Sequence, residues 1–289
     1  MSTPPPALLP HFSPLAPDYD ALLCDVWGVV HNGLVSFPDA CEALRRFRRG
    51  GGVMVFITNA PRPSEVVVRQ LEKLHVPRET YDAIVSSGDV TRSVIADRRG
   101  QRLYHLGPQR DNPIFDGFDV TFAPPETADY VVCTGLDDDD VETPEDYRGQ
   151  LQIMLERKLF MVCANPDVVV ERGNRLVYCA GALADLYASM GGEVLFAGKP
   201  YRPIYDMALA KAAQAAGRPL VPARVLAIGD SLRTDLKGAY AAGLDFLFVT
   251  SGIHAEELGG RDRPDPAAID RALAAAGGLP KAVMRHLAW

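Results

Sequence analysis

The sequence predicts an α/β fold: a doubly wound parallel sheet with helices on both faces and a smaller α/β domain inserted into it. Apolar, strand-like runs alternate with helical stretches in the first and last parts of the chain, which is typical of such a sheet. The run Val53–Thr58 is continuously apolar and rich in β-branched residues, as in a central strand buried on both faces. The middle of the chain, roughly 100–192, follows a different pattern and indicates the insertion.

Before the insertion, the alternation starts with a short apolar run that ends at Asp25. Glycines follow that run at 28 and 33, so the strand should pass into a tight loop. The expected strands are Ala21–Cys24, Val53–Thr58 and the run DAIVSS at 82–87, and the expected helices are Ala40–Arg49, Ser64–Leu74 and Asp89–Arg99.

After the insertion, the alternation resumes with VLFAGKP and continues through RVLAIGDS. Both runs end in polar residues that follow a strand. The expected strands are Val194–Pro200, Arg224–Ser231 and Leu244–Gly252, and the expected helices are Ile204–Ala216, Thr234–Ala242 and Ala272–Ala276.

The domain limits follow from where the alternation stops and resumes. A core domain is expected over 18–99 plus 193–289, with 100–192 as an inserted α/β domain. Residues 1–17 are rich in proline and are expected to form an extended arm outside the fold. The acidic run Asp137–Asp140 lacks the glycine and distal glutamate of a calcium loop, so we interpret it as a solvated loop or helix start.

The composition argues against some classes of binding partner. The chain carries 30 basic and 37 acidic residues, a formal charge of −7, which argues against a nucleic-acid or anionic-membrane partner. No apolar run approaches the length that spans a bilayer, and the N-terminus lacks the pattern of a secretory signal. The five cysteines are scattered and form no C-x-x-C pair, so we expect buried thiols in a cytoplasmic protein.

Polar residues follow four of the predicted strands. They are Asp25, Thr58-Asn59, Lys199 and Asp230. Ligands of an open parallel sheet bind beyond the carboxyl ends of its strands, so these residues should converge. Two nearby carboxylates repel one another unless a cation joins them, and Mg²⁺ prefers such oxygen ligands.

These residues suit phosphoryl transfer. Asp25 can attack phosphorus and form an aspartyl-phosphate, while Mg²⁺ and Lys199 neutralise charge on the transferring oxygens. Thr58 and the backbone N–H groups after it can hold the phosphate. Asp235 follows Asp230 by five residues and can hold a metal-bound water or Lys199.

The same segments resemble the haloacid dehalogenase (HAD) superfamily of aspartate-nucleophile phosphohydrolases. The segments are DVWGVVHNG, FITNA, GKPYRPIY and the complete G-D-x-x-x-x-D run GDSLRTD. The insertion point, together with ANPD and CAGAL, is similar to the class IIA, NagD-like branch. The resemblance covers about 21–252 and implies a HAD-like core, a C2-type cap domain, a phosphatase of small phosphate esters that requires Mg²⁺, and a possible homodimer through the cap.

One departure concerns the second aspartate of the first family motif, which protonates the leaving alcohol. Trp27 stands at that position, and its indole N–H can only donate a hydrogen bond. Acid–base help is typically worth about 10²- to 10⁴-fold. The resemblance implies that the main-chain carbonyl of Trp27 still binds the metal, with Asp25 and Asp230. We expect weak turnover of alkyl esters and less effect on acidic leaving groups; His31 is one candidate replacement acid.

Several further residues each allow two interpretations. Asn59 and Arg62 follow the second motif and are predicted to bind substrate, although a loop arginine beside prolines is often only solvated. Asn165 and Asp167 lie in ANPD and either contact substrate or form a turn. Trp27 either stacks on a ring of the substrate or excludes water.

Two other function classes stay open. The chain could be a regulatory protein that binds a phosphate ester but has lost efficient turnover, which Trp27 motivates. It could also use Asp25 for another hydrolytic chemistry with a good leaving group, such as carbon–halogen cleavage, although GDSLRTD and the insertion point argue against this.

Overall fold

The computed structural model describes residues 6–172 and 175–289, which form two compact units. The first unit holds the chain up to Thr58 together with Val68–Val85 and Pro200–Trp289. The second holds Asn59–Val67 and Ser86–Lys199. The domain limits predicted from the sequence stay predictions, because the two compact units are defined by contacts between residues and not by independent folding. Each unit is described by itself.

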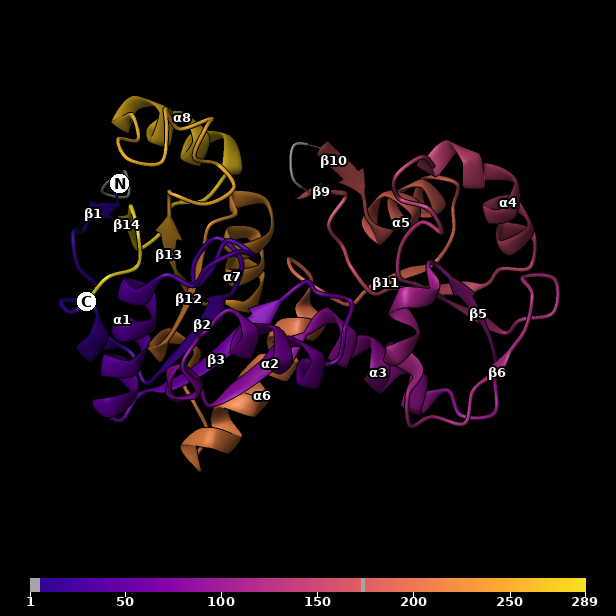
Figure 1. The fold of residues 1–289 in the computed structure, drawn as a ribbon, viewed down its shortest axis with the longest axis horizontal. Coiled ribbons are helices and arrows are strands. Elements are labelled where there is room, and N and C mark those ends of the chain that lie inside the picture. The colour runs from indigo at the N-terminus through magenta and orange to yellow at the C-terminus, as the bar shows by residue number, and fades with distance from the viewer. Residues whose placement is uncertain (1–5, 173–174) are drawn as a thin grey trace. The chain divides into compact units, whose positions relative to one another are not determined.

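The first unit contains a seven-stranded sheet (Figure 1). Its strand order is β1-β14-β13-β12-β2-β3-β4, and the pairings from β1 through to β3 are all parallel. The strands are β1 (Ala7–Leu8), β2 (Ala21–Asp25), β3 (Val53–Thr58), β4 (Ala83–Ser86), β12 (Val225–Gly229), β13 (Asp245–Val249) and β14 (Ala282–Met284).

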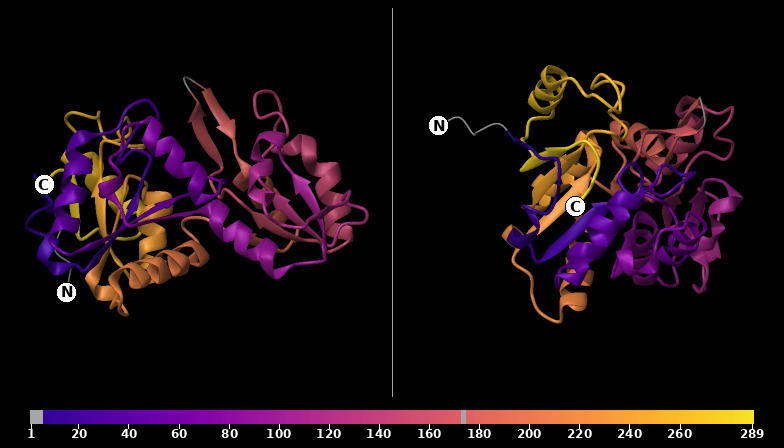
Figure 2. Two further views of the ribbon diagram at one scale, coloured as in Figure 1. Left: turned by 60° about the horizontal axis from the view of Figure 1, so that its bottom comes forward. Right: turned by 60° about the vertical axis from the view of Figure 1, so that its left-hand side comes forward.

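Helices cover both faces of this sheet (Figure 2). Successive side chains of a strand point to opposite faces, yet every residue of β2 and of β12 is buried, so both faces must be covered. Helices α1 and α6 both contact β3, and α7 contacts β13. The helices with residues in this unit are α1 (Pro38–Arg49), α2 (Ser64–Lys73), α6 (Arg202–Ala216), α7 (Lys237–Ala242) and α8 (Pro266–Ala276).

The direction of winding reverses between β2 and β12. From β2 the chain continues to β3 and β4 on one side, whereas β12, β13 and β14 follow one another on the other side. β2 and β12 are direct neighbours, with Cys24 paired to Ile228. Such a reversal leaves a crevice at the carboxyl ends of the two strands, because their connections leave in opposite directions.

The second unit is built on a five-stranded parallel sheet of order β11-β8-β7-β5-β6 (Figure 1). Its buried apolar cluster joins strand residues such as Val131 and Met161 to Leu151 and Leu183 on helices. The elements are α3 (Ser87–Asp97), β5 (Arg102–Leu106), β6 (Thr121–Phe122), β7 (Tyr130–Cys133), α4 (Arg148–Glu156), β8 (Phe160–Cys163), α5 (Ala180–Ser189) and β11 (Val194–Phe196), with β9 (Val169–Arg172) paired antiparallel to β10 (Arg175–Tyr178).

The predicted α/β class with helices packed on parallel sheets is confirmed. The strands expected at 21–24, 53–58, 82–87, 224–231 and 244–252 are present in the first unit, within a few residues at their ends. The short strand expected in the strand-and-loop run 194–200 is β11, but it pairs with β8 in the sheet of the second unit and not with the core sheet. The strongest sequence signal, the run Val53–Thr58, is β3 over the same residues.

The N-terminal segment differs from the expected arm outside the fold. Ala7 and Leu8 pair in parallel with Ala282 and Val283 of β14, so they extend the sheet. The Phe12 ring packs edge-to-face against two aromatic rings of the first unit, those of Phe47 and Trp289. Proline cannot donate to a strand ladder, but the stretch after the first prolines has free N–H groups and apolar side chains.

We expect Phe12→Ala to lower the free energy of unfolding by about 3 kcal/mol, because a fully buried phenyl ring would leave a cavity. Urea denaturation followed by tryptophan fluorescence measures this loss, because both Trp27 and Trp289 lie in the first unit. Leu8→Ala is the matched control, since Leu8 lies in the same segment but is 69 % exposed. Equal, small effects of both changes would show that the segment adds nothing to stability.

Candidate functional site

Three buried carboxylates gather at the crevice between β2 and β12. Asp25 is the last residue of β2, Asp230 follows β12 directly, and Asp235 lies in the next turn. One oxygen from each lies within 4.8 Å of the others. It is the one such group of three acidic, histidine or cysteine side chains among residues 6–172 and 175–289. The sequence predicted that these acids converge, and the structure places them together.

Asp230 is enclosed by backbone. A Cβ atom on Gly28 would lie 2.0 Å from its Oδ2 atom, and one on Gly252 would lie 1.9 Å from the same oxygen. The N–H of Ile253 donates to that oxygen over 2.7 Å. Gly28 also has φ of +79°, which side chains rarely adopt. Both glycines are therefore required for the close approach of two loops to Asp230.

Asp235 lies in a wide, π-type helical turn, Leu232–Leu236, where the sequence predicted a regular helix from Thr234. The N–H groups of Asp235 and Leu236 both donate to the carbonyl of Ser231, which widens the turn. The N–H of Ser231 donates to the Asp235 carboxylate over 3.1 Å. Local hydrogen bonds thus turn Asp235 back toward the end of β12, a feature common at functional sites.

Thr58 ends β3, the neighbour of β2. Asp25 pairs with Ile57 in the register of these strands, so Thr58 lies one residue beyond the nucleophile candidate at the same edge of the sheet. The β3 side chains before it are buried, and Thr58 is partly exposed. This edge therefore presents both a carboxylate and a hydroxyl.

The second unit holds another group of predicted site residues around Asn59. The Asn59 side-chain amide donates to the Asp167 carboxylate over 2.9 Å and to the Lys199 carbonyl over 3.1 Å. Its amide oxygen accepts from the Lys199 N–H over 2.7 Å. Asn165 accepts from the N–H of Asp167. Asn59 and Lys199 are buried, so the amide fixes the backbone that carries the lysine.

Arg62 has an exposed side chain and a fixed backbone. The Ser86 hydroxyl donates to its carbonyl over 2.6 Å, and a Cβ atom on Gly88 would lie 2.4 Å from its carbonyl carbon. Arg62 lines a cavity of about 220 Å³ together with Arg110 and Asp111. The exposed side chain can turn toward a ligand, as the substrate-binding prediction requires.

A polar network beside this cavity was not predicted from the sequence. The His105 Nε2 atom lies 2.9 Å from the Thr134 hydroxyl, which also bonds to Asp111. Burial raises the pKa of the Asp111 carboxyl and lowers the pKa of His105 to about 4. Thr134 directly follows β7, whereas His105 lies within β5 and Asp111 in the helical turn after it, so only Thr134 had the signal of a polar residue at a strand end.

Trp27 is 53 % exposed but is held in place. Its ring packs edge-to-face on His31 with centroids 5.1 Å apart, and a Cβ atom on Gly33 would lie 2.3 Å from its Cη2 atom. His31 is buried, its Nδ1 atom accepts from the Gly33 N–H, and burial lowers its pKa to about 4. His31 is therefore neutral near pH 7, which weakens the hypothesis that it replaces the missing acid.

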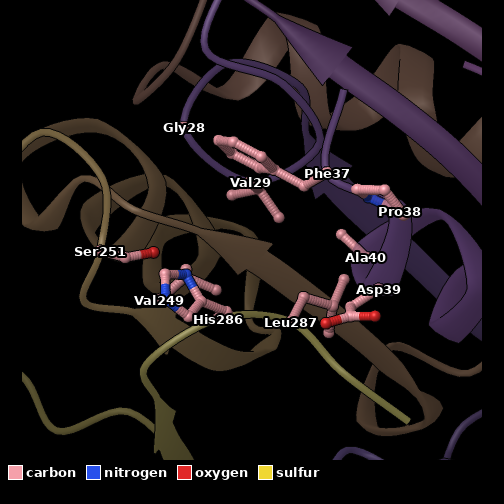
Figure 3. Close-up of a pocket in the computed structure, with 10 residues that line it drawn as sticks. All are labelled: Gly28, Val29, Phe37, Pro38, Asp39, Ala40, Val249, Ser251, His286 and Leu287. Carbon is pink, nitrogen blue, oxygen red and sulfur yellow. The ribbon is translucent and has the colours of Figure 1, made fainter. Parts of the chain in front are cut away.

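A second cavity, of about 200 Å³, lies in the first unit between the loop at Gly28–Val29 and the C-terminal segment (Figure 3). Its walls are mainly apolar, with Ser251, His286 and Asp39 as polar members. Burial lowers the pKa of His286, and the positive charge of Arg285 lowers it further, by a smaller amount. No residue predicted for the site lines this cavity.

The other features predicted from composition are consistent with the structure. All five cysteines are buried thiols. The acidic run at 137–140 lies in a loop after β7, where Asp139 pairs with Arg110. Across the two described ranges, no helix has both the length and the apolar character needed to cross a membrane.

Comparison with known proteins gives consistent matches. Residues 22–121 match the family model described as haloacid dehalogenase-like hydrolase, and residues 196–276 match one described as HAD-hydrolase-like. A crystal structure of a haloacid dehalogenase-like hydrolase from Brucella suis 1330 is 46 % identical, with a TM-score of 0.83, and the match covers 97 % of this chain and 100 % of that one.

Two curated relatives are more distant. The 5′-nucleotidase YutF of Bacillus subtilis is 26 % identical over 256 residues, which is 87 % of this chain and 95 % of YutF. The ribonucleotide monophosphatase NagD of Escherichia coli K12 is 24 % identical, over 80 % of this chain and 88 % of NagD.

Replacing His105 should reduce the acid sensitivity of the fold. Its pKa of about 4 lies below the value of 6.5 in an unfolded chain, so below pH 6.5 the unfolded state binds the extra proton. The wild type therefore loses stability as pH falls from 6.5 to 4, by about 2–3 kcal/mol from this group. In His105→Gln that part of the loss should disappear.

Urea unfolding at several pH values between 4 and 7 measures the effect. His11→Gln, at an exposed position, is the control and should follow the wild type. An unchanged pH slope in His105→Gln would show that the ring titrates normally in the folded protein.

Proposed function

The chain belongs to the haloacid dehalogenase-like hydrolase family, and from this premise we propose that it is a Mg²⁺-dependent phosphatase of small phosphate esters. The observation that carries the proposal is the group of Asp25, Asp230 and Asp235, buried together where the sheet reverses its winding. The similarity to YutF and NagD, named as a 5′-nucleotidase and a ribonucleotide monophosphatase, supports a class IIA phosphatase and a small-molecule substrate.

The acidic group fits a divalent cation. Three buried carboxylates within 4.8 Å repel one another strongly in a medium of low polarity, and a cation removes that cost. All the donors are oxygens, which Mg²⁺ prefers. We propose Asp25, Asp230 and the Trp27 carbonyl as ligands, with Asp235 supporting them. When bound, the ion would neutralise negative charge on the transferring phosphoryl group.

Asp25 supplies the nucleophile. One carboxylate oxygen attacks phosphorus, the bond from phosphorus to the ester oxygen breaks, and the leaving group departs as an alkoxide or phenolate with the bonding electron pair, to be protonated by solvent. Water then attacks the aspartyl-phosphate, which releases inorganic phosphate and restores the carboxylate. Its burial at the end of a strand holds the attacking oxygen in a fixed direction, so little orientation entropy is lost in the transition state.

The remaining residues bind the phosphate and the rest of the substrate. Thr58 donates its hydroxyl to the phosphate, and Lys199 neutralises charge that develops on the phosphoryl oxygens. The buried hydrogen bonds of the Asn59 side chain to the Lys199 backbone support this role, because they fix the main chain from which the lysine side chain extends. Arg62 is proposed to contact the substrate.

Asn165 and Asp167 complete the proposed substrate contacts. The Asp167 carboxylate already accepts from Asn59, and its N–H is held by Asn165, so both form an ordered turn after β8. A turn that is already ordered loses little entropy when it contacts a ligand. A homodimer through the inserted domain and a cytoplasmic location are part of the same proposal.

Trp27 limits which esters turn over quickly. Its indole exchanges no proton near neutral pH, so an alkoxide would leave without general-acid help. Phenolates, carboxylates and phosphates are weaker bases and leave without a proton. We therefore infer faster turnover of aryl phosphates, acyl phosphates and anhydrides than of alkyl phosphates.

Trp27 also favours a second candidate function. A protein that keeps the acidic group and the phosphate-binding residues, but lacks the acid, could bind a phosphate ester and signal its presence. This alternative predicts tight binding with negligible hydrolysis, even of activated aryl esters.

We expect the pure protein to hydrolyse 4-nitrophenyl phosphate with Mg²⁺, and Asp25→Asn to lose at least about 10³-fold in kcat because the nucleophile is gone. A chelator should abolish the wild-type rate, and excess Mg²⁺ should restore it. Circular dichroism checks that the variant is folded. Wild-type turnover no faster than that of Asp25→Asn would exclude the phosphatase and favour the binding protein.

Trp27→Asp should raise the rate on alkyl esters more than on aryl esters. A carboxyl group at this position can give a proton to an alkoxide, worth about 10²-fold or more, whereas nitrophenolate gains little. The measured quantity is the ratio of kcat/KM for glycerol 3-phosphate to that for 4-nitrophenyl phosphate. Trp27→Asn, which cannot give up a proton, is the control; equal ratios in the two variants would mean that the missing acid does not limit the wild type.

A further inference from the structure

We propose that the Trp27 indole is a fixed platform for a planar aromatic leaving group, so that the protein selects aryl phosphates over other esters. This inference rests on the proposed phosphatase function and names its substrate class. It depends on three features of the first unit: where Trp27 lies in the chain, how its ring is held, and what surrounds the ring.

Trp27 lies close to the reacting carboxylate along the chain. It is two residues after Asp25, and the next residue, Gly28, has no room for a Cβ atom because Asp230 lies against it. The Gly28 N–H donates to the His31 carbonyl over 2.8 Å. The backbone on both sides of Trp27 is therefore fixed by the same groups that build the acidic site.

The ring itself is also fixed. The His31 ring packs edge-to-face with the indole, with 78° between the two ring planes. The Gly33 N–H in turn anchors the His31 side chain by donating to its Nδ1 atom. Gly33 has φ of +87°, and the Trp27 atoms Cη2, Cζ2 and Cζ3 would lie 2.3–3.1 Å from a Cβ atom there. An exposed aromatic side chain normally gains entropy from its rotamers, so a half-exposed ring that is clamped on one side is preorganised to bind.

The loop that carries Trp27 also exposes other apolar residues. Leu34 and Val35 directly follow Gly33 in the chain and expose most of their side chains, and both N–H groups donate to the Asn32 side chain, which holds this turn. A loop that starts at the buried Asp25 and exposes three apolar side chains matches a ligand with an anionic phosphate and an apolar ring. An aryl phosphate has both, and its phenolate also leaves without the acid that Trp27 replaces.

Aromatic pairs contribute about 0.5–1.5 kcal/mol beyond simple burial, which corresponds to about a 2- to 13-fold change in a dissociation constant. That is the size of effect expected when the ring is removed. Phosphonates, which resist hydrolysis, allow binding to be measured without turnover.

The binding experiment compares phenylphosphonate with methylphosphonate by calorimetry in the presence of Mg²⁺. We expect Trp27→Leu to weaken phenylphosphonate by about 5- to 10-fold and to leave methylphosphonate unchanged, while Trp27→Phe keeps most of the preference. An equal loss for both phosphonates, or none for either, would overturn the platform.

Fluorescence gives a direct contact readout, because the chain has two tryptophans and Trp289→Phe leaves Trp27 as the single indole. Saturating 4-nitrophenylphosphonate should quench Trp27 strongly, since a stacked nitroaryl ring is an efficient quencher, and methylphosphonate should not. Equal emission with both ligands bound would show that no ring lies on Trp27.

The kinetic experiment uses 4-nitrophenyl phosphate and acetyl phosphate, two substrates that leave without a proton but differ in having a ring. We expect Trp27→Leu to raise the ratio of KM for the aryl ester to KM for acetyl phosphate by about 5- to 10-fold, with little change in the ratio of the two kcat values. A parallel rise in KM for both would overturn the proposal and assign Trp27 to water exclusion.

Gly33→Ala tests the clamp without touching the indole. A Cβ atom there would displace the ring, so the phenyl preference should fall as in Trp27→Leu. Gly51→Ala is the matched control, because Gly51 also has positive φ, +93°, with no atom near its missing side chain. Equal effects of the two changes would mean that backbone strain, not the ring position, is responsible. If neither substrate is hydrolysed, the phosphatase function fails, while the binding and fluorescence results still decide the platform.

Discussion

The repulsion between three buried carboxylates is the constraint on which the rest of the site depends. Burying ionised groups side by side is costly, and N–H groups from Ile253 and Ser231 lower this cost. The glycines that flank Asp230 serve the same arrangement, because they let two loops close around one carboxylate. Three acids gathered in this way favour a cation and, through it, an anionic substrate. The binding of a phosphate by an acidic protein is therefore a local property of this edge of the sheet.

Trp27 shows how one side chain redirects this chemistry without disturbing the acidic group. The main chain beside Trp27 is held in place, because the Gly28 N–H donates to the His31 carbonyl and Gly28 lies against Asp230. Under the proposed function, this position donates no proton but offers a large, rigid and exposed apolar surface. Both consequences favour the same substrates, since a phenol is a weaker base than an alkanol and also has a ring to stack. The second unit adds a partly buried histidine with a buried threonine and aspartate beside a cavity, in the part of the chain that differs most from the core pattern.

Some features could be predicted from sequence and others could not, for physical reasons. The continuous apolar run of β3 was recognised because a strand buried on both faces excludes polar residues. The N-terminal pairing with β14 was missed, because two strand residues among prolines carry no periodic signal. The wide turn that carries Asp235 was read as regular helix, because its shape is set by hydrogen bonds to Ser231 and not by propensity. His105 and Asp111 could not be predicted, because a single polar residue within a strand or in the turn after it is common in any α/β chain.

The sequence by itself determined which residues stand at strand ends, since local patterns of apolar residues end at Asp25, Thr58 and Gly229-Asp230. It also determined that Trp27 stands two residues after Asp25, because that is a matter of residue identity. Only the tertiary structure decided that β12 lies beside β2, which brings Asp230 and Asp235 to Asp25 from 205 and 210 positions away in the chain. It alone decided that the indole is clamped between His31 and Gly33. Strand order and ring orientation are set by packing between distant segments, and packing energies of that kind leave no periodic trace in the sequence.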